Sequence, residues 1–587
     1  MRTEWDLSKL YEGFDAKYDS DTKELKELVV MFKEAVSSDK TNQVQYIENV
    51  LVLEEKIQCL LTSLFSYPSL RQSTNVNDQE CPKHLAKISS IARNLTEPQV
   101  DFTKFLKGVD LDSLAKKSTL INTYLFILNE RKQNSKRMLS KKEEVLYSKM
   151  KELASSSWSD LQSLCTANLL IDFRGKKMPL SVIRNLAYEK DSTTRKEAYE
   201  AELHGYESIE NYVALGLSNI KREVNTIGKL RGYKNALEAS LETCRMTKKS
   251  LDALISTMRD YRKVFASYLK AKAKYLGYKE GLPFYDMFAP VGKFDKTFSF
   301  EDSRAFVLEG YYSYSKKLGD FGKKVFDNAW IDVYPKAGKV GGAFCANLPF
   351  LKESRVLTNF TGTLSDCLTL AHELGHAYHG EVMSDNAPLN TDYPMQLAET
   401  ASIFCETIIN NNLLSKITDK EERLAILENS LQDSTQVIID ILSRYIFETN
   451  LIKASEGPVS APEMKELMIN AQKEAYLDGL DAKLLHPYMW LCKGHYYSAG
   501  FNFYNFPYAF GLLYGKGLYS VYLKDKESFI KKYDDMLALT THETAENVAL
   551  SMGIDITKKD FWIGSLDQIK EQVEEVIALF SELKKKK

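Results

Sequence analysis

The sequence predicts a mostly α-helical fold with one small β-structured region. Long segments carry apolar residues at spacings of three and four with charged residues between them, which is the pattern of an amphipathic helix. Proline is scarce, with 14 in 587 residues, and lies mostly between these segments. The clearest helical segments are 21–37, 140–155, 192–229, 247–276 and 301–325.

The segments 330–349 and 354–362 differ from the rest of the chain. They are rich in β-branched and aromatic residues and are punctuated by glycine and proline, so we expect short strands. A strand edge can bind an extended peptide through main-chain hydrogen bonds, and Gly341, Gly342 and Ala343 would leave room for its approach. The alternative is a hairpin that only covers a neighbouring helix.

The segment 370–377, with the sequence LAHELGHA, is the most informative stretch of the chain. His372 and His376 lie four residues apart, so on a helix both imidazoles share one face, about 6 Å apart, and can reach one metal ion. Glu373 points to the flank of that face, where it can accept a proton from water without binding the metal. Two ordinary histidines beside a helix glutamate are the alternative, which the chain's content of only eight histidines disfavours.

A hydrolytic zinc ion takes three protein ligands and leaves one position for water. His379 is a poor third ligand, because it lies seven residues, or about 10 Å of helix rise, beyond His372. Glu399 opens an apolar, strongly helical stretch that could return antiparallel to the first helix and bring this carboxylate to the metal. Glu406 lies two turns further on the same face, where it could hydrogen-bond a ligating histidine. The alternative for both is a solvated helix face.

The segment 494–517 alternates glycine with tyrosine. Its glycines allow close approach of the backbone and its phenols are neutral hydrogen-bond donors, as expected near an oxyanion. The alternative is an aromatic core with buried hydroxyl groups.

Composition excludes several classes of function. The net charge of -2 gives no electrostatic basis for binding nucleic acid or an anionic membrane. The chain has no run of about eighteen apolar residues and its first residues lack a secretory signal, so we expect no membrane span. The eight cysteines are scattered without a C-x-x-C pair, which predicts reduced thiols and a cytoplasmic location.

Together, these motifs resemble the thimet-oligopeptidase-type zinc peptidases, and the chain is most similar to the bacterial oligoendopeptidase F branch. The resemblance covers nearly the whole chain. Its matching pieces are Trp5 to Tyr11, Gly342-Ala343-Phe344, Phe360 to Ala371, His372-Glu373-x-x-His376, Glu399-Thr-Ala-Ser402-x-Phe404-x-Glu406 and His495…Tyr504…Pro507-Tyr508 to Gly511.

The resemblance implies the roles of further residues. One Zn²⁺ ion would be held by the two motif histidines and Glu399. A late histidine and two later tyrosines contact substrate and stabilise the transition state in these relatives, and by position they correspond to His495, Tyr504 and Tyr508. Tyr497 is a further candidate for substrate contact. The strand residues Gly342, Ala343 and Phe344 would bind the peptide backbone.

The resemblance also implies an elongated helical body split by a deep substrate channel. Residues 1–190 would form part of the channel wall, and residues 191–587 would be the catalytic region, with the small sheet beside the zinc helices. A narrow channel would admit short unfolded peptides and exclude folded proteins. The predicted function is therefore a zinc endopeptidase of oligopeptides. A carboxydipeptidase-type exopeptidase and a catalytically silent peptide-binding scaffold are the alternatives, and both a monomer and a homodimer are compatible with the sequence.

Overall fold

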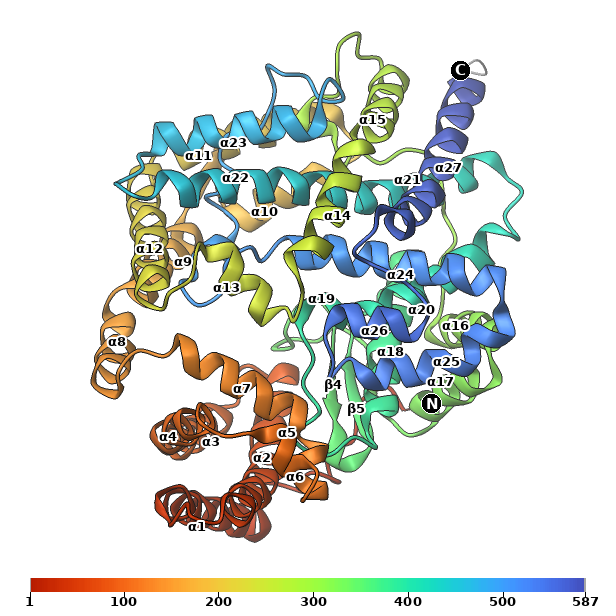
Figure 1. Ribbon diagram of the computed structural model, residues 1–587. Coiled ribbons are helices and arrows are strands. Elements are labelled where there is room, and N and C mark those ends of the chain that lie inside the picture. The colour runs from red at the N-terminus through yellow and green to blue at the C-terminus, as the bar shows by residue number, and fades with distance from the viewer. Residues whose placement is uncertain (1, 585–587) are drawn as a thin grey trace.

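The structure is a computed structural model that describes residues 2–584. It is built from helices with a few short strands, so the predicted mostly α fold is confirmed (Figure 1). The first helices are α1 (Ala16–Ser37), α2 (Gln43–Thr74), α3 (Glu80–Ala92), α4 (Thr96–Leu106), α5 (Leu111–Ala115), α6 (Thr119–Thr123) and α7 (Leu125–Arg137). Then follow α8 (Lys141–Leu153), α9 (Ser155–Asn168), α10 (Leu180–Asn185), α11 (Ser192–Tyr206), α12 (Glu210–Leu230), α13 (Ala236–Thr243), α14 (Lys248–Asp260), α15 (Arg262–Leu276), α16 (Phe300–Tyr314) and α17 (Lys316–Asp327). The last are α18 (Leu364–Met383), α19 (Met395–Ala398), α20 (Thr400–Leu414), α21 (Lys420–Thr435), α22 (Ile441–Ala454), α23 (Ala461–Tyr476), α24 (Phe506–Lys524), α25 (Lys526–Leu539), α26 (Ala545–Ser551) and α27 (Lys559–Lys584).

Three of the long predicted segments are each divided into two helices. The segment 192–229 becomes α11 and α12, 247–276 becomes α14 and α15, and 301–325 becomes α16 and α17. At the last break Ser315 adopts an extended conformation and its hydroxyl accepts a hydrogen bond from the Leu318 backbone N–H. A serine in this position starts a new helix, because it satisfies an amide that has no partner within the helix.

Two hydrophobic cores organise the chain. Helices α1 to α7 enclose the first, which is drawn from residues 10–128 together with Leu348. The second begins at Leu169 and extends to Leu583. Figure 1 shows α1 to α7 gathered below the rest of the molecule. The two cores therefore divide the chain between residues 128 and 169, while the predicted boundary at 190 stays a prediction.

The predicted strands form a three-stranded sheet beside α18. Its strands are β3 (Ile331–Asp332), β4 (Phe344–Leu348) and β5 (Glu353–Leu357), in the order β3-β5-β4. β5 runs parallel to β3 and antiparallel to β4, with Phe344 opposite Leu357. β4 is therefore an edge strand. A separate antiparallel pair is formed by β1 (Leu170–Phe173) and β2 (Lys176–Pro179).

The two helices that carry the motif residues pack at very short distance. α18 begins with a reciprocal capping box between Thr363 and Asp366. A Cβ atom added to Gly375 of α18 would lie 2.6 Å from the Cα of Ser402 in α20. Only glycine permits this approach, which brings the backbone of α20 against the helix that carries both histidines.

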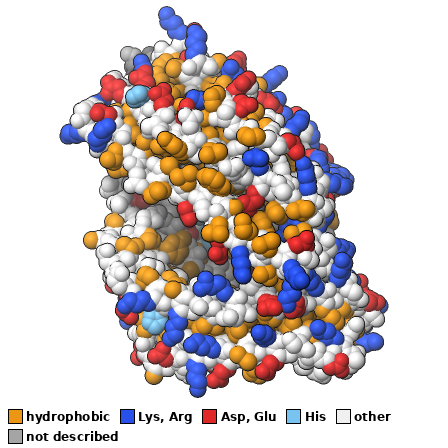
Figure 2. Space-filling model, turned by 90° about the vertical axis from the view of Figure 1, so that its left-hand side faces the viewer, with side chains coloured by type: hydrophobic (Ala, Val, Ile, Leu, Met, Phe, Trp, Pro, Cys, Tyr) orange, Lys and Arg blue, Asp and Glu red, His pale blue; other side chains and the backbone are white. Residues whose placement is uncertain are grey.

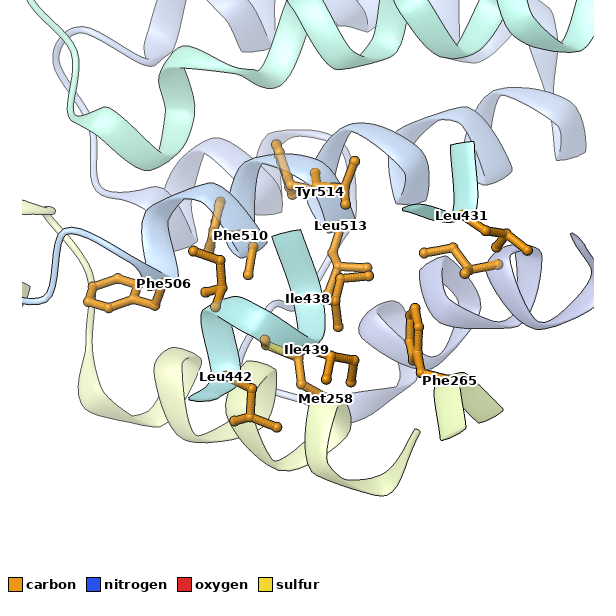
Figure 3. Packing of buried hydrophobic residues seen from close by; sticks show 14 of the residues in the cluster. Met258, Phe265, Leu431, Ile438, Ile439, Leu442, Phe506, Phe510, Leu513 and Tyr514 are labelled. Atoms are coloured by element: carbon orange, nitrogen blue, oxygen red, sulfur yellow. The ribbon is translucent and has the colours of Figure 1, made fainter. Parts of the chain in front are cut away.

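A close-packed core supports α24. In Figure 3, Phe510 and Leu513 of α24 face Ile438 and Ile439 of the π-helical turn Gln436–Asp440, with Met258 of α14 beyond them. All five of these side chains are fully buried. Interiors of this density hold their helices in one arrangement, so α24 is a rigid base for the residues at its N-terminal end.

The molecule is hollowed between its two parts. Figure 2 shows a deep hollow in the face turned to the viewer. Two cavities, of about 760 Å³ and about 480 Å³, are lined by residues of α7 and of α13 and share Phe501 in their walls. The predicted channel corresponds to this space. Among the helices of residues 2–584, none has the length and apolar character that crossing a bilayer requires.

Candidate active site

The three predicted metal ligands converge in the structure. His372 Nε2 lies 3.1 Å from Glu399 Oε2, and His376 Nε2 lies 3.4 Å from the same oxygen. The two imidazole rings are 4.9 Å apart and stand nearly perpendicular. Within the described part of the chain, this is the one group of three such side chains whose ligand atoms lie close enough to share a metal ion.

The geometry and the charge of this group fit a zinc ion. Tetrahedral zinc with bonds of about 2.0–2.1 Å separates neighbouring ligand atoms by about 3.3 Å, close to the separations found here. Burial disfavours a charged His372, but hydrogen bonds and charge from Glu399 and Glu406 raise the pKa of His372 to about 10. The carboxylates therefore favour positive charge at this point, and two imidazoles with one carboxylate form a typical hydrolytic zinc set.

Two further side chains hydrogen-bond the predicted metal ligands. Glu399 lies at the junction of α19 and α20, and the hydroxyl of Ser402 donates a 2.7 Å hydrogen bond to its Oε2. His372 Nδ1 donates to Glu406 Oε2 over 3.2 Å, so the geometry expected for Glu406 is present. This bond leaves Nε2 of His372 free to face a metal ion.

The charges of the three predicted ligands act on Glu373, which is therefore close to them. Glu373 is not one of the three side chains whose ligand atoms lie close enough to share a metal ion. Its residue exposure is only 7%. Burial raises the pKa of Glu373, and the charge of Glu399 adds to this effect, whereas His372 and His376 oppose it. A carboxylate with a raised pKa can accept a proton from water and release it again near neutral pH, which suits a general base.

The edge strand β4 lies on the Glu373 side of the site. The charge of Glu373 contributes to raising the pKa of Cys345 in this strand, after burial. Gly342 is exposed with a φ of 79°, and its carbonyl accepts a 2.8 Å hydrogen bond from Asn359 Nδ2. Ala343 and Phe344 are half-buried, and the Phe344 ring is 6.3 Å from Trp5. Gly342 and Ala343 therefore lead into the edge strand, which begins at Phe344, lies beside the carboxylate and contacts the N-terminal part.

The three predicted transition-state residues lie together. The rings of His495 and Tyr504 are stacked, with centroids 4.9 Å apart, and Tyr508 is 5.4 Å from Tyr504 and 6.2 Å from His495. Burial, a hydrogen bond with Tyr504 and the charge of Glu399 all raise the pKa of Tyr508. The charge of the Glu399 carboxylate therefore reaches the Tyr508 phenol, which keeps its proton as a donor.

His495 and Tyr504 have further contacts that define their state. Burial, with the nearby charges of Arg444 and Lys493, lowers the pKa of His495, so its ring is neutral near pH 7. The Tyr504 hydroxyl donates to the sulfur of Met395, in the short helix that precedes Glu399. The aromatic cluster is thus connected to the short helix α19 that directly precedes Glu399.

Tyr497 lies apart from this cluster. Its exposure is 2%, and its hydroxyl donates to the Trp490 carbonyl over 3.3 Å. A phenol so engaged has little surface for a peptide, and these contacts favour the aromatic-core alternative for this residue.

His379 is fully buried and lies outside the group of three side chains that could share a metal ion. Its Nε2 is 2.9 Å from the hydroxyl of Thr540, and its ring stacks on Tyr393 at 4.5 Å. Sequence reasoning assigned no role to Gly375 or to Ser402. A glycine in a helix interior was the available signal for Gly375, whereas the Ser402 contact depends on the helix break at Glu399.

Comparison with known proteins agrees with this geometry. Residues 185–568 match the sequence profile of a family described as peptidase family M3. An oligoendopeptidase F homolog from Lactococcus lactis subsp. lactis is 25% identical over 97% of this chain and 96% of its own length. Oligopeptidase PepF from Bacillus subtilis is 23% identical over 99% and 88%. The crystal structure of oligoendopeptidase-F from Enterococcus faecium has the same fold, with a TM-score of 0.73, 18% identity and coverage of 96% and 99%.

Proposed function

The chain belongs to peptidase family M3 and is a metalloendopeptidase acting on oligopeptides, and from this premise we propose the residues and the metal that carry the reaction. The metal is one Zn²⁺ ion, held by His372, His376 and Glu399. The observation that carries this proposal is the convergence of two imidazole nitrogens on one carboxylate oxygen at 3.1 and 3.4 Å, beside the buried Glu373.

A zinc ion bound by these three side chains would act as a Lewis acid, polarising the peptide carbonyl and lowering the pKa of water. Glu373 takes the proton of the attacking water and later delivers it to the leaving amine. Its raised pKa suits both transfers. Glu406 holds the His372 ring in place through Nδ1.

The aromatic cluster stabilises the oxyanion of the tetrahedral intermediate. The phenols of Tyr504 and Tyr508 are neutral donors, and Tyr508 lies within the influence of Glu399. The stacked His495 ring supports Tyr504 and presents a neutral imidazole to the substrate.

The substrate is a short, extended peptide. Its backbone pairs, as an added strand, with Gly342, Ala343 and Phe344 where the chain enters the edge strand β4. The rest of the substrate peptide then continues into the space between α7 and α13. The cavities there, of about 760 Å³ and about 480 Å³, have room for several residues but not for a folded domain. Access therefore selects for unfolded oligopeptides.

A reducing, cytoplasmic location is part of the proposal. It is supported by the thiols of the eight cysteines, all of which are free. The protein acts as a monomer or a homodimer, and neither arrangement alters the residues assigned above.

The direct test is mass spectrometry of a mixture of peptides of graded length and one folded protein after incubation with the purified enzyme. Internal cleavage of the short peptides alone, lost with a chelator and restored by Zn²⁺, is the expected result. Trimming from one end only would instead support a carboxydipeptidase-type exopeptidase. Absence of cleavage with zinc bound would support a silent scaffold.

A further inference from the structure

The loop that carries Tyr504 has a strained backbone. Phe503 has a φ of 56°, in the left-handed region that a bulky side chain rarely adopts, and it is only 3% exposed. Tyr504 follows it directly, and Asn505 is the N-cap of α24, the helix of Tyr508. A conformation of this kind persists only where its surroundings hold it.

A buried ion pair lies beneath this loop. Lys221 of α12 and Glu448 of α22 approach to 2.9 Å, and their side chains are 0% and 1% exposed. Burying two charges is costly, and such a pair is weak evidence for stability. Such a pair can instead fix one conformation of the segment that it contacts. The other hydrogen bonds of Lys221 and Glu448 identify that segment.

Both charges bind the loop, one on each side of Tyr504. Lys221 Nζ donates to Asn502 Oδ1 over 2.8 Å, and Glu448 Oε2 accepts from Asn505 Nδ2 over 2.9 Å. Asn505 Oδ1 in turn accepts from the backbone N–H of Phe506 over 2.6 Å, which caps α24. The ion pair therefore contacts Asn502 and Asn505, which lie on either side of Tyr504. Because Asn505 caps α24, the pair also sets the start of the helix that carries Tyr508.

We propose that Lys221 and Glu448 are positioning residues that hold the phenols of Tyr504 and Tyr508 in the geometry needed to stabilise the transition state. They act through Asn502 and Asn505, without touching the substrate. This inference rests on the proposed role of the two phenols. A displacement of about 1 Å at a reacting group can lower a rate by about 10²-fold, so releasing the loop affects the chemical step more than substrate binding.

The test replaces both members of the pair, as Lys221→Met with Glu448→Met, so that neither charge is left buried alone and the chain can still fold. The matched control is Lys272→Met with Glu428→Met. Lys272 and Glu428 form another ion pair with exposures of 0% and 2%, and the bonds of this pair run to Tyr268, Gln432 and the Met287 carbonyl instead of the tyrosine loop. Each variant is assayed for kcat, KM, zinc content, Tm and affinity for a phosphinic peptide that carries a tetrahedral anion.

We expect the test variant to lose at least about tenfold in kcat and in phosphinic-peptide affinity, with KM and zinc content within about twofold of wild type. The control variant should retain the wild-type kcat even if its Tm falls by as much as the Tm of the test variant. Equal kcat values for test and control would overturn the inference, because a general loss of stability would then account for both.

A second variant guards against failure to fold. Asn502→Leu removes the acceptor for Lys221 on the loop and leaves the ion pair itself intact. A loss of at least about tenfold in kcat supports the positioning of the tyrosine loop by Lys221 and Glu448, which we call the clamp. An unchanged kcat overturns it.

Tyr504→Phe and Tyr508→Phe in the same assay separate the clamp hypothesis from the proposed role of the two phenols. If these lower kcat while the clamp variants do not, the positioning role is wrong and the proposed function stands. If they leave kcat unchanged, the role of the phenols is wrong, and the clamp hypothesis falls with it.

Discussion

Ser402 Oγ donates a 2.7 Å hydrogen bond to Glu399 Oε2, the same oxygen that lies nearest the two histidine nitrogens. The hydroxyl is three residues along from the carboxylate, across the break between α19 and α20. If Glu399 binds the metal as proposed, this hydrogen bond fixes the direction of its carboxylate, so metal affinity should depend on Ser402, which does not itself bind the metal.

Ser402→Ala should lower the affinity for Zn²⁺ by about 10–100-fold, because the carboxylate loses its orienting donor. Competition with a chromogenic chelator measures this affinity. Ser443→Ala is the control, because Ser443 is equally buried but donates to the Asp440 carbonyl instead. Equal zinc affinities for the two variants would show that Ser402 does not orient Glu399.

Gly375→Ala should destabilise the fold by about 1–3 kcal/mol. The new Cβ would lie 2.6 Å from the Ser402 Cα and 2.8 Å from the Ala401 carbonyl oxygen, and backbone atoms cannot move aside as a side chain can. Urea unfolding measures the change. Gly564→Ala in α27 is the control, because nothing lies within 4 Å of its Cβ position, and there alanine should stabilise the helix by up to about 1 kcal/mol. Equal effects at the two positions would contradict the close packing of α18 on α20.

Tyr508→Phe should lower kcat by about 10²-fold with little change in zinc content, a loss typical of removing one oxyanion donor. Steady-state kinetics on a peptide cleaved at one bond measures it. Tyr514→Phe, six residues further along α24, removes a buried hydroxyl that donates to the Met536 sulfur, and it should leave kcat unchanged. An unaltered kcat in Tyr508→Phe would remove this residue from the mechanism.

His379 should make stability fall in mild acid. Burial lowers its pKa to about 3, against an ordinary value of 6.5, so below about pH 6.5 the unfolded chain binds a proton that the folded protein does not. The stabilisation is complete above the unfolded pKa and is lost progressively as the pH falls towards the folded one. Between about pH 7 and about pH 5.5 this one site should account for a loss of about 1 kcal/mol.

Urea unfolding at the two pH values measures that loss. His379→Gln should reduce the pH dependence by this amount, whereas His204→Gln, at a side chain that is 86% exposed, should leave it as in wild type. An identical pH dependence in wild type and His379→Gln would show that His379 is not held neutral in the fold.

The helical fold and the central residues of the site could be predicted from the sequence, because local spacing encodes them. His372 and His376 lie on one helix and need no tertiary information to be paired. His495, Tyr504 and Tyr508 came from the family resemblance, since their grouping beside Glu399 depends on the packing of α24 against α20.

Other features were beyond local patterns. Tyr497 lies in the same glycine- and tyrosine-rich segment as Tyr504, and only the fold places its hydroxyl against the Trp490 carbonyl. Lys221 and Asn502 are 281 positions apart, so no periodicity could have joined them. The breaks inside three long helical segments were also missed, because apolar spacing continues through a break that a cap residue such as Ser315 creates.

The measurement that tests the account most directly is the zinc content and turnover of Glu373→Gln, determined on the same preparation. The account predicts zinc bound as in wild type, because Glu373 is not a ligand, together with a fall in turnover of about 10²- to 10⁴-fold, because the general base is lost. Turnover equal to wild type would contradict the assignment of Glu373 as the base. Loss of zinc from the variant would instead show that this carboxylate helps to hold the metal.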